Sequence, residues 1–245
     1  MNLRHSWIIA LKDIKVFIRK RTVLYTVVLL PLLLSILFPL VIEFGGRKTG
    51  GITGSYLLTL LDSFAWFFVI IPAIIPGPIA SYSIAGEKLE KSLERLLATP
   101  TTDGEILLGK SIAAFLPGIV ATYVGASIFM ALIDAVTYSK LGYYYYPNWD
   151  MGTILLLLAP LALLLSIELN VITSSRVSDV RAAGQLGSLT FLPLIAIYIA
   201  SEIGVITLDT NTLLIIAGII ALLDVVLFRL STSVFQREQI LTKWK

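Results

Sequence analysis

The sequence predicts an all-α membrane protein with six transmembrane helices, because its apolar residues are gathered into runs long enough to cross a bilayer. Hydrophobic residues make up 57% of the 245 residues and charged residues only 14%. A hydrocarbon core about 30 Å thick needs roughly 20 apolar residues in a helix, and each span must be helical because unpaired backbone groups are costly in lipid. The predicted spans are residues 23–42, 56–80, 111–133, 153–173, 186–203 and 212–229.

The lysines and arginines orient these spans. Segments on one side of the predicted membrane hold 16 of the 19 Lys and Arg residues, and the loops on the other side hold three, Arg47, Lys48 and Lys140. Short loops rich in Lys and Arg stay on the cytoplasmic side. We therefore expect cytoplasmic N and C termini in a multi-pass protein of the cell (plasma) membrane.

Residues 1–22 predict an amphipathic helix that lies in the inner membrane interface and leads into the first span. Its apolar residues recur at helical spacing and are opposed by basic ones. The apolar residues are Leu3, Trp7, Leu11, Ile14 and Ile18, and the basic ones are Arg4, Lys12, Lys15 and Arg19. A simple topology anchor would have the same composition, so that alternative stays open.

Residues 143–149, YYYYPNW, lie in a predicted outer loop and are rich in tyrosine and tryptophan. This composition is typical of the interface between membrane and water. The aromatic rings could alternatively stack on a sugar or another substrate. The sequence favours the interfacial interpretation.

The longest internal loop on the predicted cytoplasmic side, residues 81–110, has the periodicity of a helix rather than of a connector. Its apolar stripe consists of Leu89, Leu93, Leu96 and Leu97. Pro100 disfavours helical geometry at the preceding residue and ends this helix. Thr102 and Glu105 then have the spacing of a capping box, which predicts a second helix running into the third span. A connector needs only a few residues, so we interpret the loop as a docking surface.

Residues 104–111, GEILLGKS, match the phosphate-binding pattern G-x-x-x-x-G-K-[ST] letter for letter. That motif needs a preceding β-strand and a loop whose backbone N–H groups surround the phosphates. Here a helix cap precedes the match and a membrane span follows it. Residues 219–224, IIALLD, imitate a magnesium-binding strand but lie inside the sixth span. We therefore expect no ATP site in this chain.

The run SIAGEKLEKSLERLLATP, followed by EILLGK, resembles the signature of ABC type-2 transporter permeases. In that family a glutamate, then L-E-x-L-L-x-T-P and I-L-x-G-K, marks the cytoplasmic coupling helix between the second and third spans. Residues 174–185, SSRVSDVRAAGQ, are similar to the family's segment between the fourth and fifth spans. The chain departs from the pattern at Lys91 and Ser92, where many members have Gly-Thr, and this puts the detailed contacts in doubt.

The resemblance implies that residues 1–245 form a single ABC type-2 transmembrane domain, the permease subunit of an exporter. Two such chains, as a homodimer in the lipid bilayer, would form the translocation pathway and associate with two copies of an ATP-binding cassette ATPase. The permease would need no cofactor of its own, because ATP and Mg²⁺ would bind to the ATPase. The residues carried over as ATPase-coupling are Glu87, Leu93, Glu94, Leu96, Leu97, Thr99, Pro100, Gly109 and Lys110.

Three carboxylates, Asp62, Glu168 and Asp224, lie within or at the edge of predicted spans. Ionisable groups in the membrane are rare and are candidates for function, here a substrate or cation pathway. Structural pairing is the alternative. Its partners for Glu168 and Asp224 would be Arg176, Arg181 or Arg229. Asp62 could simply cap a span that begins nearer the outer surface.

Other classes of protein fit the sequence less well. There is no cysteine and only one histidine, His5, so neither a thiolate site nor a histidine metal cluster is expected. No hydrolase or metalloprotease motif is present, so we expect no catalytic residue and no enzyme. The basic residues are not interleaved with aromatic ones as in a nucleic-acid-binding surface. A secondary carrier using the intramembrane carboxylates remains the alternative, but it would not explain the loop at 81–110.

Overall fold

The computed structural model describes residues 3–48, 55–81, 101–176 and 180–234. These residues form α-helices and one π-helical turn, with no β-strand among them. The elements are α1 (Leu3–Arg19), α2 (Arg21–Lys48), α3 (Ser55–Ile74), α4 (Pro76–Ser81), α7 (Asp103–Leu141), α8 (Trp149–Thr153), the π-helical turn η2 (Ile154–Leu158), α9 (Ala159–Arg176), α10 (Val180–Ser188), α11 (Phe191–Glu202) and α12 (Thr210–Val234).

Six helical stretches are long and apolar enough to cross a membrane, which confirms the predicted all-α class and number of spans. They are Leu24–Gly45, Tyr56–Ile74, Asp103–Leu141, Trp149–Ser174, Gly184–Glu202 and Thr210–Ser231. The third is much longer than the apolar run that predicted it. The capping box of Thr102 starts it early, and Gly142, with a φ of 77°, ends it in the left-handed conformation that glycine adopts readily.

Prolines divide the second and fifth spans. Pro76 has no N–H, so the helical ladder of α3 ends where the amide of Ile75 donates to the carbonyl of Ile71 at 3.1 Å, and α4 begins afresh. Pro193 lies in the first turn of α11 and cannot donate to the carbonyl of Leu189, where the chain leaves α10. The second predicted span, 56–80, is therefore two helices rather than one.

The second and fourth spans form the centre of the molecule. In each, 61% of the apolar window is buried, compared with 33% or less in the other four spans. Phe38 of α2 stacks on Phe64 of α3 with ring centroids 4.3 Å apart, and it meets Phe129 of α7 edge-on. The indole N–H of the fully buried Trp66 donates to the carbonyl of Leu194 in α11 at 3.1 Å. These aromatic side chains thus tie together four helices, α2, α3, α7 and α11.

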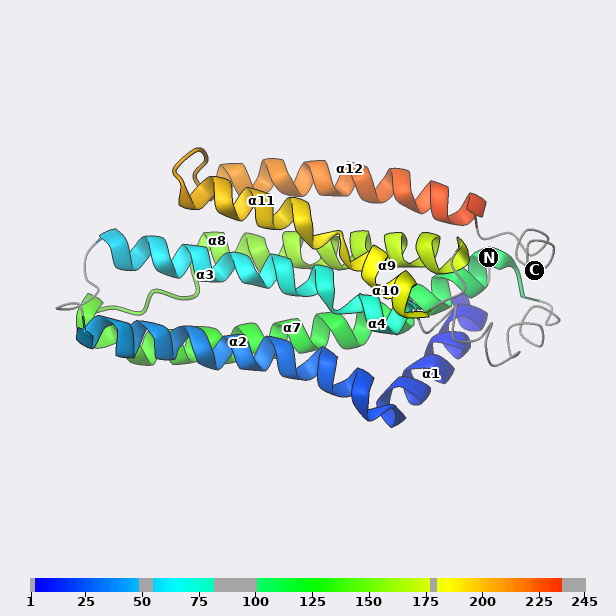
Figure 1. The fold of residues 1–245 in the computed structure, drawn as a ribbon, viewed down its shortest axis with the longest axis horizontal. Helices are drawn as coiled ribbons and strands as arrows, with labels where there is room; N and C mark the ends of the chain where they lie inside the picture. The colour runs from blue at the N-terminus through cyan, green and yellow to red at the C-terminus, as the bar shows by residue number, and fades with distance from the viewer. Residues whose placement is uncertain (1–2, 49–54, 82–100, 177–179, 235–245) are drawn as a thin grey trace.

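The helices run side by side along the long axis of the molecule, and α1 lies at an angle to them at one end (Figure 1). The beginning of α7 and the ends of α9 and α12 lie at this same end. Helix α1 and the end of α12 therefore lie at the same end of the bundle, as an even number of spans requires.

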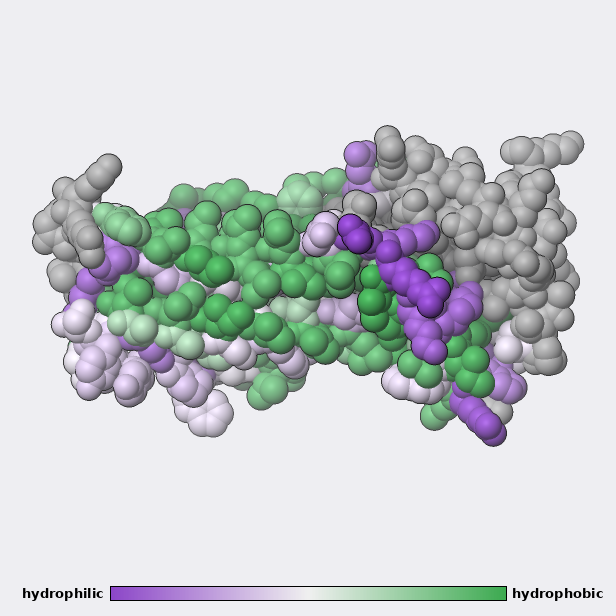
Figure 2. Space-filling view, turned by 90° about the horizontal axis from the view of Figure 1, so that it is seen from below, coloured by the Kyte–Doolittle hydropathy of each residue, from purple (hydrophilic) through white to green (hydrophobic). Residues whose placement is uncertain are grey.

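Helix α1 presents two different faces. The face that packs against the rest of the molecule consists of Ser6, Ile9, Ala10, Asp13 and Phe17. The predicted apolar stripe is instead mostly exposed, with Leu3, Trp7, Leu11 and Ile18 all at the surface. Figure 2 shows hydrophilic side chains gathered over α1 beside a broad apolar band that follows the other helices.

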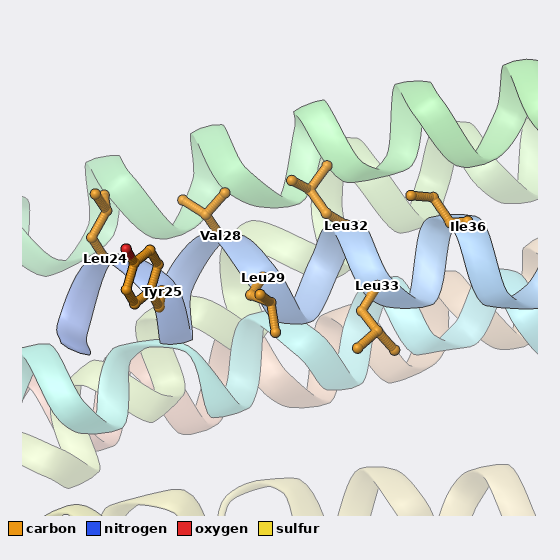
Figure 3. A pocket seen from close by; sticks show the side chains of 7 residues that line it. All are labelled: Leu24, Tyr25, Val28, Leu29, Leu32, Leu33 and Ile36. Carbon is orange, nitrogen blue, oxygen red and sulfur yellow. The ribbon is translucent and has the colours of Figure 1, made fainter. Parts of the chain in front are cut away.

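The outward face of α2 carries a shallow groove of about 450 Å³, shown in Figure 3. Its lining is apolar apart from one tyrosine hydroxyl and consists of Leu24, Tyr25, Val28, Leu29, Leu32, Leu33 and Ile36. Side chains of this kind, exposed over several turns of one helix, are those of a surface in contact with hydrocarbon rather than water. This face supports the assignment of α2 as a membrane span.

Candidate functional site

Most of the predicted coupling segment lies outside the described residues. This applies to Glu87, Leu93, Glu94, Leu96, Leu97, Thr99 and Pro100. Gly109 and Lys110 are described, and both lie near the start of α7, where the predicted loop at 81–110 ends. The site can therefore be built from the point where the loop enters the third span.

The capping box predicted at this point is confirmed. The amide of Glu105 donates to Thr102 Oγ1 at 3.3 Å, and the amide of Thr102 donates to Glu105 Oε2 at 3.1 Å. Two backbone amides that would otherwise lack partners at the helix start are thereby satisfied. Thr102, at the described end of the loop, is thus fixed to the start of α7.

Gly109 allows α1 to pack closely against this first part of α7. A Cβ atom at Gly109 would lie 2.6 Å from the backbone carbonyl oxygen of Ser6 and 2.9 Å from the Cβ of Ile9. Neither of these atoms can move without moving α1 itself. The small residue is therefore required by the approach of the two helices.

Lys110 and Asp13 form a buried ion pair across the same contact. Lys110 Nζ lies 3.5 Å from Asp13 Oδ2, and both side chains are almost wholly buried, at 1% and 6% exposure. Lys12 Nζ approaches the other oxygen of Asp13 at 3.1 Å from a half-exposed position. A second polar contact joins the helices nearby, where His5 Nδ1 lies 3.3 Å from Glu105 Oε2.

These contacts also settle the phosphate-binding resemblance of residues 104–111. The whole segment is helical, as predicted, and no loop is present there to surround a phosphate. The lysine that would reach the phosphates is Lys110, which points into the α1 contact and is buried against Asp13. The match to the motif is coincidental.

Sequence reasoning found Gly109 and Lys110 but missed their partners on α1. Asp13 looked like one acidic residue in a basic helix. The available signal was its position, because Asp13 shares a helical face with Ile9, Ala10 and Phe17 and so lies on an apolar face. A lone carboxylate on such a face implies a cationic partner.

The structure brings Glu168 and Asp224 together. Glu168 of α9 and Asp224 of α12 line one cavity with Arg229, and both carboxylates are buried, at 9% and 7% exposure. Within the described part of the chain, Glu168 Oε2 and both oxygens of Asp224 have no hydrogen-bond partner. The side chains of Arg176 and Arg181, two of the three arginines in the pairing alternative, lie outside the described part of the structure, so that alternative stays open.

Asp62 lies elsewhere, and the prediction that it caps a helix is wrong. Helix α3 begins at Ser55, so Asp62 is two turns inside it. The hydroxyl of Tyr145 donates to Asp62 Oδ1 at 2.6 Å. Burial and this hydrogen bond raise the pKa of Tyr145 above its ordinary value, so the phenol keeps its proton and acts as donor.

Only part of the tyrosine-rich loop is exposed as an interfacial belt would require. Tyr143, Tyr144 and Trp149 are exposed, but Tyr146 is buried and its hydroxyl donates to the carbonyl of Leu61 at 2.9 Å. The amides of Tyr145 and Tyr146 both donate to Asp134 Oδ1, at 3.0 and 3.1 Å. These two tyrosines hold the outer loop onto α3 and α7.

Tyr145→Phe should therefore lower the thermal stability of the detergent-purified protein, by about 1.5–3 kcal/mol for a lost hydrogen bond to a carboxylate. Tyr144→Phe is the matched control, because Tyr144 is 70% exposed, and its effect should be within about 0.5 kcal/mol. Equal melting temperatures for the two variants would show that the bond to Asp62 does not stabilise the fold.

Comparison with known protein families identifies the family of this chain. Residues 7–236 match the sequence profile of the family described as ABC-2 family transporter protein. No curated protein matches the chain. Because the family match covers almost all of the sequence and the described residues supply six candidate spans, the chain belongs to the ABC-2 transporter family, as a multi-pass membrane subunit without a catalytic domain.

Proposed function

We propose that the chain is the permease of an ABC exporter, a homodimer driven by ATP hydrolysis in two separate ATPase subunits. The observation that carries this proposal, beyond family membership, is the anchoring of α1 on the first turns of α7. These turns contain EILLGK, the last part of the segment that resembles the family's coupling signature. A force applied to the loop would therefore move α7 and α1 together.

The proposed orientation places both termini and residues 81–110 in the cytoplasm. The excess of Lys and Arg in the segments on that side supports it. Helix α1 would lie in the inner interface, with its exposed apolar side chains among the acyl chains and its basic ones at the headgroups. In that position α1 would lie along the membrane surface and move together with the start of α7. Residues 1–245 would then act as one transmembrane domain.

Coupling then follows from differential binding. An ATPase that closes on ATP can shift the permease between inward-facing and outward-facing states only through contacts that differ between them. The leucines of residues 81–100 are the proposed contacts, and Glu87 and Glu94 are polar neighbours on the same segment. The rigid connection to α7 and α1 would carry the movement to the first and third spans.

Leu93→Asp tests the proposal, because a charge on the apolar stripe must be desolvated on docking, at several kcal/mol. We expect this variant to lose most of its co-purification with the ATPase and its stimulation of ATP hydrolysis. Ala98→Asp adds the same charge on the opposite face of the predicted helix and should retain both. Co-purification and hydrolysis unchanged by Leu93→Asp would refute docking through this stripe.

A further inference from the structure

Glu168 and Asp224 form a pair of buried carboxylates near the inner end of two spans. Glu168 lies six residues before Ser174 and Asp224 seven before Ser231, the last residues of the fourth and sixth spans. At 1.5 Å per residue both are about 10 Å from the helix ends. They line a cavity of about 240 Å³ that is open on one side, together with Val225, Phe228 and Arg229, of which Val225 and Phe228 are exposed.

Among the residues that the structure describes, the charges lining this cavity do not balance. Two carboxylates and one guanidinium line it, so the described lining has a net charge of −1 when ionised. Three of the four carboxylate oxygens are buried and accept no hydrogen bond from any described residue. Unpaired carboxylates at this depth are unfavourable, and one added positive charge would neutralise the site.

A second cavity adjoins the first and shares Glu168 and Phe228 with it. Its volume is about 190 Å³, and apart from Glu168 and Ser111 its lining is apolar. The apolar side chains come from α7, α9 and α12 and are Leu108, Ile112, Phe115, Leu164, Ile167 and Phe228. Together the two cavities reach the size of small-molecule sites, roughly 300–1,000 Å³.

The lining favours an organic cation over a metal ion. Hard cations such as Ca²⁺ take about six to eight oxygen ligands, and no three potential metal ligands gather anywhere among the described residues. An alkylammonium group needs only opposite charge and surfaces for its carbon atoms. The ring of Phe228, which lines both cavities, could also attract a cation through its π-face.

We propose that Glu168 and Asp224 bind the charged group of an organic monocation, whose apolar part lies in the adjoining cavity beside Phe115 and Leu164. The further statement that this cation is cargo rests on the proposed export function. The binding site itself does not, because all its residues belong to one chain.

Benzyltrimethylammonium is a suitable probe, with one fixed positive charge and one phenyl ring. We expect saturable calorimetric binding to the full-length, detergent-purified chain, and no binding of neopentylbenzene, its neutral counterpart of the same shape. Glu168→Gln and Asp224→Asn should each weaken binding at least tenfold. Asp209→Asn, which removes an exposed carboxylate just before α12, should leave the affinity unchanged.

Leu164→Trp supplies a test that keeps both carboxylates, because it fills the apolar cavity and should also weaken binding at least tenfold. The proposal is overturned if the wild-type chain does not bind the probe, if neopentylbenzene binds equally well, or if folded Glu168→Gln and Asp224→Asn proteins bind normally. Displacement of the probe by equimolar Na⁺ would overturn it too, because the site would then select inorganic cations.

The same measurements separate this proposal from that of ATPase coupling. Leu93→Asp should abolish coupling and leave probe binding intact. Normal coupling without probe binding would refute only the cation site. Probe binding in a chain that never associates with an ATPase would refute only the coupled function.

Discussion

Lys110→Ala is expected to destabilise the protein by about 3 kcal/mol, because it removes the buried ammonium group that pairs with Asp13. Breaking a buried ion pair in this way generally costs about 3–5 kcal/mol. Lys12, 3.1 Å from the other carboxylate oxygen, should keep the loss near the lower limit. In a chain of this size the melting temperature should fall by about 6–12 °C, measured by tryptophan fluorescence in detergent.

Two further variants make this prediction specific. Replacing the pair together, as Asp13→Leu with Lys110→Met, removes both charges and should recover most of the lost stability. Lys12→Ala removes only a half-exposed partner and should cost less than about 1 kcal/mol. A double variant as unstable as Lys110→Ala would mean that the charge pair is not the source of the effect.

Nucleotide provides an independent control for Lys110. Because this lysine is buried against α1, ATP should stabilise neither the isolated wild-type chain nor Lys110→Ala. An ATP-dependent rise in melting temperature, lost in the variant, would restore the phosphate-binding interpretation of residues 104–111.

Gly109→Ala is expected to destabilise the contact between α1 and α7, by about 1–3 kcal/mol as for other overpacked positions. The added methyl group would lie 2.6 Å from the carbonyl oxygen of Ser6, and a backbone atom can yield only if α1 moves. Hydrogen exchange should therefore increase in α1 more than in α9. Gly109→Ala should also reduce stimulation of the ATPase, because α1 and the start of α7 are the helices proposed to move with the coupling loop.

Gly218→Ala is the matched control, because a Cβ atom there meets nothing within 4 Å in the middle of α12. The same substitution at this open helical position should stabilise the protein by about 0.5–1 kcal/mol, through the lower helix propensity of glycine. A rise in stability for both variants would contradict the close approach of α1 to Gly109.

Much of the fold was predictable because the local composition of a segment decides whether it crosses the membrane. Each span needs about 20 apolar residues, and six such runs are visible in the sequence and present as helices. The capping box at Thr102 and Glu105 was equally accessible, since its two partners are three residues apart. The breaks at Pro76 and Pro193 could not be placed by hydropathy, because proline's missing N–H interrupts a helix without making it polar.

The candidate site was predictable only in part. Gly109 and Lys110 were selected through a family pattern, and the coupling role of residues 81–100 remains a proposal. The interfacial assignment of the outer tyrosines was incomplete, because Tyr145 and Tyr146 bond to residues more than 80 positions away. The alternative that Asp62 caps a helix failed for the same reason, since its partner is Tyr145 and not its own helix end.

By itself the sequence determined that this chain crosses a membrane with six helices, and where its loops carry positive charge. The tertiary structure alone decided that Lys110 pairs with Asp13 and that Glu168 and Asp224 line one cavity. Hydropathy and helical periodicity depend on residues within a few turns of one another. Which side chains of distant helices come into contact depends on how those helices pack. Hydropathy does not indicate this packing, because the lipid-facing and protein-facing positions of a span are equally apolar.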